Sequence, residues 1–198
     1  MGLLAVVIAY LIGGIPFGYV LVRLTTGKDV RASGSGNIGA TNVLRTTGRA
    51  VAVATLALDI LKGYAAVWLA AYLTNESVEV MSAAALAVMA GHAFPVFLGF
   101  KGGKAVASFI GAFLYLAPLP LFAVLFVFVV VVVATRYISA GSILAAATFP
   151  FGVWIILHPP ISVLLAALIA GAFIVWRHRE NIGRLHAGTE SVFVWRRN

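Results

Sequence analysis

The residues best suited to chemistry lie in Ser33–Arg45, which reads SGSGNIGATNVLR. A glycine-rich backbone can turn successive amide groups toward one point, and a helix that begins there adds the positive end of its dipole. Gly34, Gly36 and Gly39 have the spacing of a dinucleotide-binding fingerprint, but no predicted strand precedes them. The stretch therefore predicts a phosphate-binding loop outside a Rossmann fold, with Arg45 as its permanent cation.

A second candidate phosphate site is Lys101–Lys104, with the sequence KGGK. Its glycines would free backbone amides and its lysines would supply charge. An ordinary turn between two helices explains the glycines equally well. A third polar segment, Arg136–Ser142, contributes small hydroxyl donors. Both segments follow apolar runs, so we expect them at a membrane surface.

A fourth polar segment follows the last apolar run and contains His178, Asn181 and Arg184. If Arg177–Leu185 is helical, these residues share one face because they are three positions apart. Histidine can transfer protons near neutral pH, although a single histidine at an interface is more often a surface residue. Glu190 is better interpreted as a structural partner of a nearby arginine than as an acid or base.

Asp59 and Lys62 are ionisable residues inside an apolar run, three positions apart. Charges within a membrane are expensive, so such residues are often functional. The spacing favours a mutual ion pair with a structural role. The histidines and carboxylates do not have the spacing of metal ligands, and we predict no catalytic metal. The chain has no cysteine, which excludes disulfides and thiol nucleophiles.

The composition is that of an integral membrane protein. Of 198 residues, 62% are hydrophobic and only 10% are charged, which is too apolar for a soluble domain. The net charge of +8 comes from basic residues in short loops between apolar runs, so it indicates membrane topology rather than nucleic-acid binding. No basic residue precedes Arg23, and we expect the first apolar run to be a retained helix rather than a signal peptide.

The fold predicted from these runs is a single all-α membrane domain over residues 1–198, a bundle of about seven transmembrane helices. The expected spans are Leu3–Leu24, Ala50–Leu73, Met81–Phe100, two pieces of Ala105–Ala134, Ile143–Leu157 and Ile161–Trp176. Pro118 and Pro120 divide Ala105–Ala134 into pieces of about 13 or 14 residues, roughly 20 Å each against a hydrocarbon core of about 30 Å. These pieces are either short or tilted helices or one re-entrant pair.

Seven spans place the amino terminus outside and the carboxyl terminus in the cytoplasm. Thirteen of the fourteen lysines and arginines then lie on the cytoplasmic side, and only Lys62 lies within a span. The four polar segments all fall on that side. Cations, glycines and small donors on one side suit an anionic water-soluble substrate that reacts with a molecule dissolved in the membrane.

Two other functions fit a small polytopic protein. A transporter or flippase for a phosphate-bearing metabolite needs a polar path to the outside, but the outer loops offer an anion only Glu76, Glu79 and His158. A non-enzymatic membrane scaffold would not need the dense glycine, asparagine and serine content of Ser33–Arg45. Both alternatives are therefore disfavoured.

Three motifs in order, spread over essentially the whole chain, carry a resemblance to a known family. They are SGSGNIGATNVLR at Ser33–Arg45, GHAFPVFLGFKGGKAVAS at Gly91–Ser108 and HRENIGRLHAGTE at His178–Glu190. The chain resembles the bacterial membrane glycerol 3-phosphate acyltransferases that use acyl phosphate as donor, the PlsY family. The family's usual KGGKGVAT reads KGGKAVAS here, with Ala105 for glycine and Ser108 for threonine.

The resemblance implies transfer of a fatty acyl group from acyl phosphate to the first hydroxyl of glycerol 3-phosphate, giving lysophosphatidate for phospholipid synthesis. It implies a multi-pass protein of the bacterial inner membrane with a site facing the cytoplasm. The expected partners are the two substrates and membrane lipids, without a cofactor, nucleic acid or obligatory protein partner.

The expected site residues combine the resemblance with the residue chemistry. The expected catalytic residues are Ser35, Asn37, Lys104, Ser142, His178 and Asn181. The expected phosphate-binding residues are Ser35, Gly36, Thr41, Asn42, Arg45, Gly102, Gly103 and Lys104, and the expected structural residues are Glu190, Asp59 and Lys62.

The expected mechanism has no covalent acyl-enzyme, because phosphate is already a good leaving group and positioning can suffice. In keeping with this, the sequence lacks GxSxG and the His-x4-Asp pattern of another acyltransferase class. The base that takes the hydroxyl proton is either His178 or the phosphate of the substrate itself.

Overall fold

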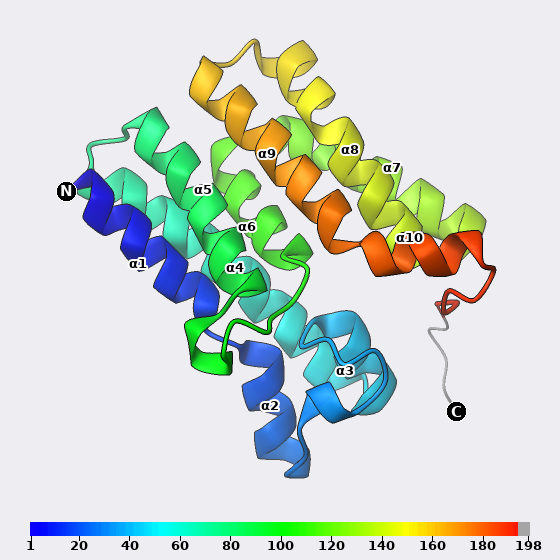
Figure 1. Cartoon of the computed structure of the whole chain (residues 1–198). Helices are drawn as coiled ribbons and strands as arrows, with labels where there is room; N and C mark the ends of the chain where they lie inside the picture. The colour runs from blue at the N-terminus through cyan, green and yellow to red at the C-terminus, as the bar shows by residue number, and fades with distance from the viewer. Residues whose placement is uncertain (194–198) are drawn as a thin grey trace. The chain divides into compact units, whose positions relative to one another are not determined.

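The computed structural model describes residues 1–193, and this part of the chain consists of ten α-helices and two 3₁₀ helices joined by loops (Figure 1). The helical class predicted from the sequence is confirmed. The chain forms two compact units, Met1–Leu116 and a second that begins at Ala117. Helices satisfy their own backbone hydrogen bonds, which is the condition for crossing a bilayer.

The first unit contains the following helices: α1 (Gly2–Gly14), α2 (Phe17–Thr26), η1 (Val30–Ala32), α3 (Ala40–Thr46), α4 (Arg49–Leu73), α5 (Val78–Ala93), η2 (Val96–Leu98) and α6 (Val106–Leu116). In it, α1 packs on α4 and α5, and α6 packs on the same two helices (Figure 1). A Cβ added to Gly13 would overlap the carbonyl of Val88, and one on Gly91 would overlap that of Tyr10. Small residues thus let these backbones approach closely.

The span predicted for the first apolar run, Leu3–Leu24, is confirmed as a candidate span over Gly2–Thr26, and it contains a break. The helix stops at Gly14 and resumes at Phe17. Pro16 has no N–H to donate and its ring restricts the preceding turn, which explains the interruption. The third expected span, Met81–Phe100, is likewise interrupted: α5 ends at Ala93 and only the short η2 follows.

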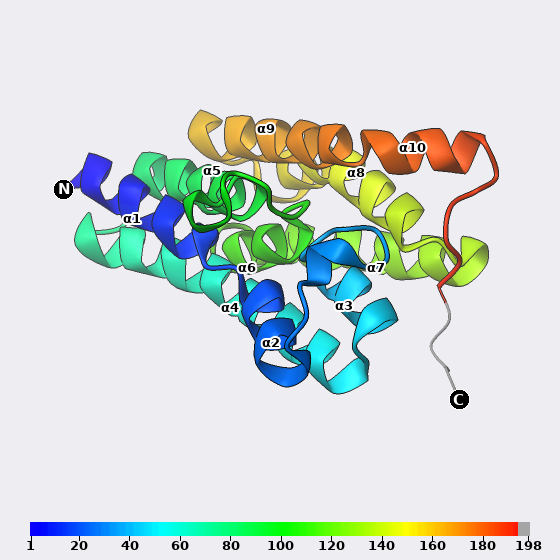
Figure 2. The same cartoon turned by 60° about the horizontal axis from the view of Figure 1, so that its bottom comes forward.

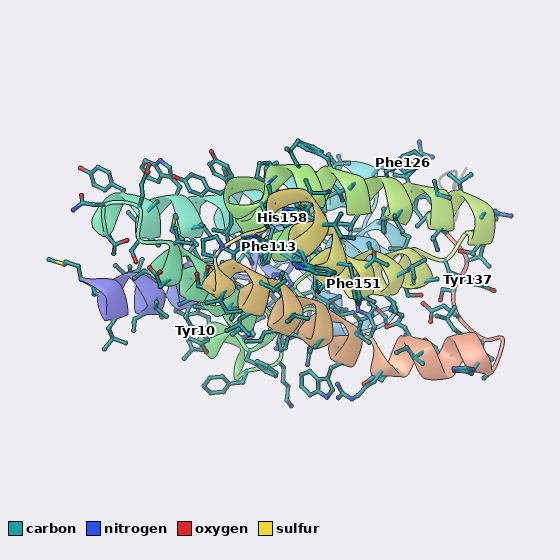
Figure 3. The ribbon with its side chains drawn as sticks, turned by 90° about the horizontal axis from the view of Figure 1, so that it is seen from above. Tyr10, Phe113, Phe126, Tyr137, Phe151 and His158 are labelled. Carbon is teal, nitrogen blue, oxygen red and sulfur yellow. The ribbon has the colours of Figure 1, made fainter. Side chains whose placement is uncertain are left out.

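The second unit contains α7 (Pro118–Thr135), α8 (Ile138–Leu157), α9 (Ile161–Arg177) and α10 (Arg179–His186). α8 packs on both α7 and α9, and α10 is bent by 54° from α9 (Figure 1). Seen from above, His158 lies at the turn between α8 and α9, and Phe126 on α7 points away from the other helices of its unit (Figure 3). Phe126 is 71% exposed, as expected for a residue that faces lipid.

The central apolar run divides unequally, which corrects the expectation of two similar pieces. α6 has 11 residues and α7 has 18. Pro118 and Pro120 both fit in the first turn of α7, where backbone N–H groups have no helical partner. α8 also starts earlier than the predicted Ile143, so Ser142 lies inside a helix rather than in a turn.

Five helical stretches among the described residues are long and apolar enough to cross a membrane, and the bent pair α9 and α10 makes a sixth. The shorter apolar helix α6 is the seventh run. These are the seven runs identified from the sequence. The direction in which they cross remains a prediction. Residues 194–198, the end of the basic tail predicted to be cytoplasmic, lie outside the described part.

Candidate functional site

The glycine-rich loop that precedes α3 is organised by the side chain of Asn42. Its Oδ1 accepts the backbone N–H of Ser35 at 2.9 Å. Its Nδ2 group donates to the carbonyls of Val30, Ser33 and Asn37 at 3.2, 3.0 and 2.8 Å. An amide group has only two donor hydrogens, so these three carbonyls share them. Asn42, expected to contact a phosphate, instead shapes the loop.

The same loop depends on glycine at two positions. Gly34 and Gly36 have φ of 61° and 70°, a left-handed conformation that L-residues adopt only at a cost. A Cβ on Gly34 would also overlap Asn42 Oδ1. Asn37 Oδ1 accepts the N–H of Gly39 at 2.8 Å, which closes a local turn. Ser35 and Gly36 are left at the exposed tip.

The short helix α3 follows this tip and carries the other predicted residues of the motif. Thr41 lies in its first turn and Arg45 in its last, four positions apart and therefore on one face. Beneath the loop is a buried apolar cluster formed by Val22, Val30, Ile38, Val43 and Ala52. The loop is therefore anchored to α2 and α4, and Figure 2 shows α2, α3 and the start of α4 gathered at one end of the first unit.

The KGGK segment reaches the same end of the first unit, because Leu98 of η2 packs against the apolar cluster beneath the loop. Gly102 N–H donates to the carbonyl of Ala93 at 3.2 Å, and Gly103 N–H donates to that of His92 at 3.0 Å. These bonds satisfy carbonyls at the carboxyl end of α5. The two amides expected to bind phosphate therefore have another use, and the turn interpretation of these glycines is favoured.

Packing also explains why both positions are glycine. A Cβ on Gly102 would overlap the carbonyl of His92, and one on Gly103 would overlap the His92 ring. The next residue, Lys104, is half-buried. Ala105 then has φ of 62° with its side chain fully buried. An L-residue in this conformation is strained by about 1–2 kcal/mol, which explains why glycine suits the position.

Asp59 and Lys62 form the ion pair that their spacing favours. Lys62 Nζ lies 2.6 Å from Asp59 Oδ1, and both side chains are buried in the first unit. His92 Nδ1 lies 3.6 Å from the same oxygen. No role was predicted for His92, and its place in the second motif was the only available signal. Its neighbours became apparent only from the packing of α4 against α5.

In the second unit, Glu190 joins residues from two helices, α8 and α10. It accepts hydrogen bonds from Ser139 Oγ at 2.9 Å, Asn181 Nδ2 at 2.8 Å and Arg184 Nε at 2.8 Å. Burial raises the pKa of the Glu190 carboxyl, but these donors and the charge of Arg184 outweigh burial, so the pKa lies below its usual value. The arginine partner expected for Glu190 is Arg184. Ser139 was not predicted.

His178 lies at the junction of α9 and α10, so the helix expected over Arg177–Leu185 is broken there. Its side chain is buried, and Nδ1 lies 2.8 Å from the carbonyl oxygen of Ile174. A carbonyl can only accept, so Nδ1 carries the proton and Nε2 is the basic nitrogen of the neutral ring. Ser142 Oγ donates to Ile138 O at 2.9 Å.

The predicted residues thus fall into two groups, each held within its own unit. In the first unit, Asn42 links Ser35 and Asn37 in one loop, and the end of α5 holds Gly102 and Gly103 through its last carbonyls. In the second, Asn181 is held by Glu190. The first group offers an exposed hydroxyl and cations, which suit an anionic ligand. The second offers a buried imidazole and amide, which suit proton transfer and orientation.

The chain is similar to known proteins over nearly all of its length. The model of a family described as glycerol-3-phosphate acyltransferase matches residues 3–188. The glycerol-3-phosphate acyltransferase of Desulforamulus reducens is 48% identical over 183 residues, which are 92% of this chain and 90% of that protein. The enzyme of the same name from Geobacter sulfurreducens is 48% identical, over 96% of this chain and 97% of its own length.

Two crystal structures have the same fold. Both are of PlsY (YgiH), an integral membrane glycerol 3-phosphate acyltransferase. Its glycerol 3-phosphate form is 39% identical with a TM-score of 0.92, covering 98% of this chain and 96% of that one. Its lysophosphatidic acid form is 37% identical with a TM-score of 0.89, covering 98% and 95%.

Proposed function

The chain belongs to the glycerol-3-phosphate acyltransferase family of membrane enzymes, and from this premise we propose that it transfers a fatty acyl group from acyl phosphate to the 1-hydroxyl of glycerol 3-phosphate. The products are lysophosphatidate and inorganic phosphate. The observation that carries the proposal is the similarity over nearly the whole chain to a structure solved in glycerol 3-phosphate and lysophosphatidic acid forms.

The reaction needs one new ester bond and one broken acyl–phosphate bond. The hydroxyl oxygen adds to the acyl carbonyl carbon and loses its proton to a base. The tetrahedral intermediate then collapses with the phosphate as leaving group. Because the donor is already activated, no covalent acyl-enzyme is required, and the enzyme acts by positioning two anionic groups and stabilising the oxyanion.

In the first unit, we assign phosphate binding to Ser35, Arg45 and Lys104. Ser35 lies at the exposed tip of a loop whose shape is set by Asn42, so its hydroxyl is placed to meet a ligand, whereas the Gly36 N–H expected to bind phosphate donates to the carbonyl of Ser33 at 3.1 Å. Arg45 offers a planar guanidinium that suits a phosphate, and Lys104 offers a compact charge. Thr41 shares the face of α3 that carries Arg45, which supports a contact to the same ligand.

In the second unit, we assign orientation of the reacting groups to Asn181 and Ser142, and proton transfer to His178 or to a phosphate oxygen of the substrate. The bond from Nδ1 to Ile174 supports the first option, since it directs the proton to one nitrogen and leaves Nε2 basic. A His178→Ala variant that keeps most of its kcat would exclude histidine as the base. A fall of about 100-fold or more with KM preserved would support it.

The donor is tested with the purified protein in lipid, incubated with radiolabelled glycerol 3-phosphate and either acyl phosphate or acyl-CoA. We expect labelled lysophosphatidate from acyl phosphate alone. Product from acyl-CoA alone would overturn the proposed donor and leave the acceptor intact. A folded protein that makes no product from either donor would overturn the proposed function.

We further propose that the enzyme lies in the bacterial inner membrane with its site facing the cytoplasm. The absence of cysteine from the sequence makes this easy to test with single introduced cysteines and an impermeant maleimide. Glu79→Cys, in the loop region predicted to be external, should react in intact spheroplasts. Lys28→Cys should react only after permeabilisation. The reverse pattern would overturn the orientation.

A further inference from the structure

Asp59, Lys62 and His92 form a buried ionic cluster in the first unit, and the three residues are 2%, 4% and 4% exposed. Asp59 on α4 pairs with Lys62 one turn later and faces His92 on α5. A buried ion pair gains little net stability, because desolvation offsets most of the attraction. Fold stability alone is therefore a weak explanation for it, and its neighbours indicate a more specific role.

One neighbour of the cluster is the interruption of the first apolar run. Lys62 Nζ donates to the carbonyl oxygen of Ile15 at 2.9 Å, at the point where α1 has ended. The same ammonium lies 5.6 Å from the centre of the Phe17 ring, in the first residue of α2. Lys62 thus holds both sides of the junction between α1 and α2, and α2 leads into the glycine-rich loop.

The other neighbour is the KGGK segment. The His92 ring occupies the space that a side chain at position 103 would need, and the His92 carbonyl accepts the N–H of Gly103. Gly103 is therefore held through both the ring and the backbone of a single residue. Lys104 follows directly along the chain. The His92 ring therefore lies against the residue that immediately precedes Lys104.

We propose that the Asp59–Lys62–His92 cluster positions Lys104 for catalysis: Asp59 orients the His92 ring, the ring places Gly103, and Gly103 places the Lys104 ammonium against a substrate phosphate. This rests on the proposed function, in which Lys104 binds such a phosphate. The three residues are positioning residues, since none of them needs to touch the substrate. A misplacement of about 1 Å in a catalytic group can lower the rate about 100-fold.

The first test compares Asp59→Asn, Lys62→Met and the double variant that carries both changes. Each single change leaves an unpartnered charge or polar group in the interior, so both should lower the melting temperature. The double variant removes both charges together, so its melting temperature should return most of the way to that of the wild type. We nevertheless expect its kcat/KM to stay about 10- to 100-fold below wild type. A double variant with wild-type kcat/KM would overturn the proposal, because the cluster would then serve folding alone.

A second test does not depend on the folding of the charge variants. Gly103→Ala places a methyl group where the His92 ring lies, and should lower kcat/KM about 10- to 100-fold. In a His92→Ala background the space is open, so adding Gly103→Ala should change kcat/KM less than about twofold. An equal loss in both backgrounds would show that the ring contact is irrelevant. Gly152→Ala, where an added Cβ meets only ordinary contacts, is the matched glycine control.

The wild-type assay separates the two possible failures. No lysophosphatidate from wild-type enzyme with acyl phosphate would overturn the proposed function and remove the premise of this inference. If the wild type is active, two results would overturn the positioning role alone. One is a double variant with wild-type kcat/KM, and the other is an equal loss of kcat/KM from Gly103→Ala in both backgrounds.

Discussion

The two units shape their candidate site residues by different means. In the first unit, backbone groups are the partners: Asn42 holds one backbone N–H and three carbonyls, and Gly102 and Gly103 donate their amides to the end of α5. In the second unit, side chains are the partners: Glu190 collects Ser139, Asn181 and Arg184.

The difference matters because the Asn42 hydrogen bonds involve a neutral side chain, whereas the Glu190 hydrogen bonds involve a charged one. The neutral amide of Asn42 does not titrate, so the loop around it should keep its shape over a wide pH range. The Glu190 carboxylate holds its donors only while it is ionised. The glycine-rich loop shaped by Asn42 should therefore be insensitive to pH, and the Glu190 network in the second unit should be sensitive to acid.

The largest effect is expected from Asn42→Ala. It leaves the Ser35 N–H and three carbonyls without their partner and should destabilise the first unit by about 3 kcal/mol, with a large rise in the KM of a phosphate substrate. Melting temperature and kinetics in lipid would measure both. The control is Thr46→Ala, at an exposed position, which removes the hydrogen bond from the Thr46 hydroxyl to the backbone carbonyl of Asn42. It should change the free energy of unfolding by less than about 1 kcal/mol. Similar effects from the two variants would contradict the central role of Asn42.

Glu190→Gln should have the next largest effect. The substitution keeps the shape but removes the charge that Arg184 faces, at an expected cost of about 2 kcal/mol in stability together with reduced kcat. Thermal unfolding at neutral pH measures the loss of stability, and the lysophosphatidate assay measures kcat. Glu180→Gln, at an exposed position on α10, is the matched control and should be nearly neutral. Equal losses in both would contradict a specific Glu190 network.

The pH dependence should distinguish the two arrangements directly. Because the folded-state pKa of Glu190 lies below its ordinary value of 4.5, its stabilisation is present above that value and is lost as the pH falls through the folded pKa. The difference in melting temperature between wild type and Glu190→Gln should therefore shrink in acid. The difference between wild type and Asn42→Ala should stay constant. A Glu190→Gln difference that does not change with pH would contradict the charged network.

The smallest effect is expected from Ala105→Gly. This change relieves the left-handed strain at a buried loop residue and should raise stability by about 1 kcal/mol, less whatever the lost methyl contacts contribute. Ala112→Gly, in the interior of α6, should instead lower stability by about 1 kcal/mol. The melting temperatures of the two variants show whether each substitution stabilises or destabilises the protein. Destabilisation by both would show that packing, rather than backbone conformation, decides the residue at position 105.

Much of the fold could be predicted because it follows from local composition. Long apolar runs must form helices in a bilayer, and proline and charged residues show where those runs are interrupted. The exact division could not be predicted: Pro118 and Pro120 were expected to separate two similar pieces, but both fit in the first turn of α7. A proline shows where a helix is interrupted without showing on which side of the interruption it will lie.

The site was predicted in part. Motif composition identified the residues, and spacing favoured the pairing of Asp59 with Lys62. Asn42, Gly102 and Gly103 were predicted to contact a phosphate, but in the structure their polar groups bond to the backbone. A polar group suited to a ligand is equally suited to a neighbouring backbone group. His92 suggested no specific role, because nothing in its surroundings along the chain distinguishes it from an ordinary residue at the end of a helix.

Local composition thus suffices to show that this is a helical membrane protein, which segments are polar and which residue types are available for phosphate and acyl chemistry. The packing of distant segments sets which of those groups remain exposed to a ligand and which are used internally. The physical reason is that a buried donor or acceptor must find a partner. That partner is set by segments far apart in the chain, such as Lys62 with Ile15, Gly103 with His92, and Ser139 with Glu190.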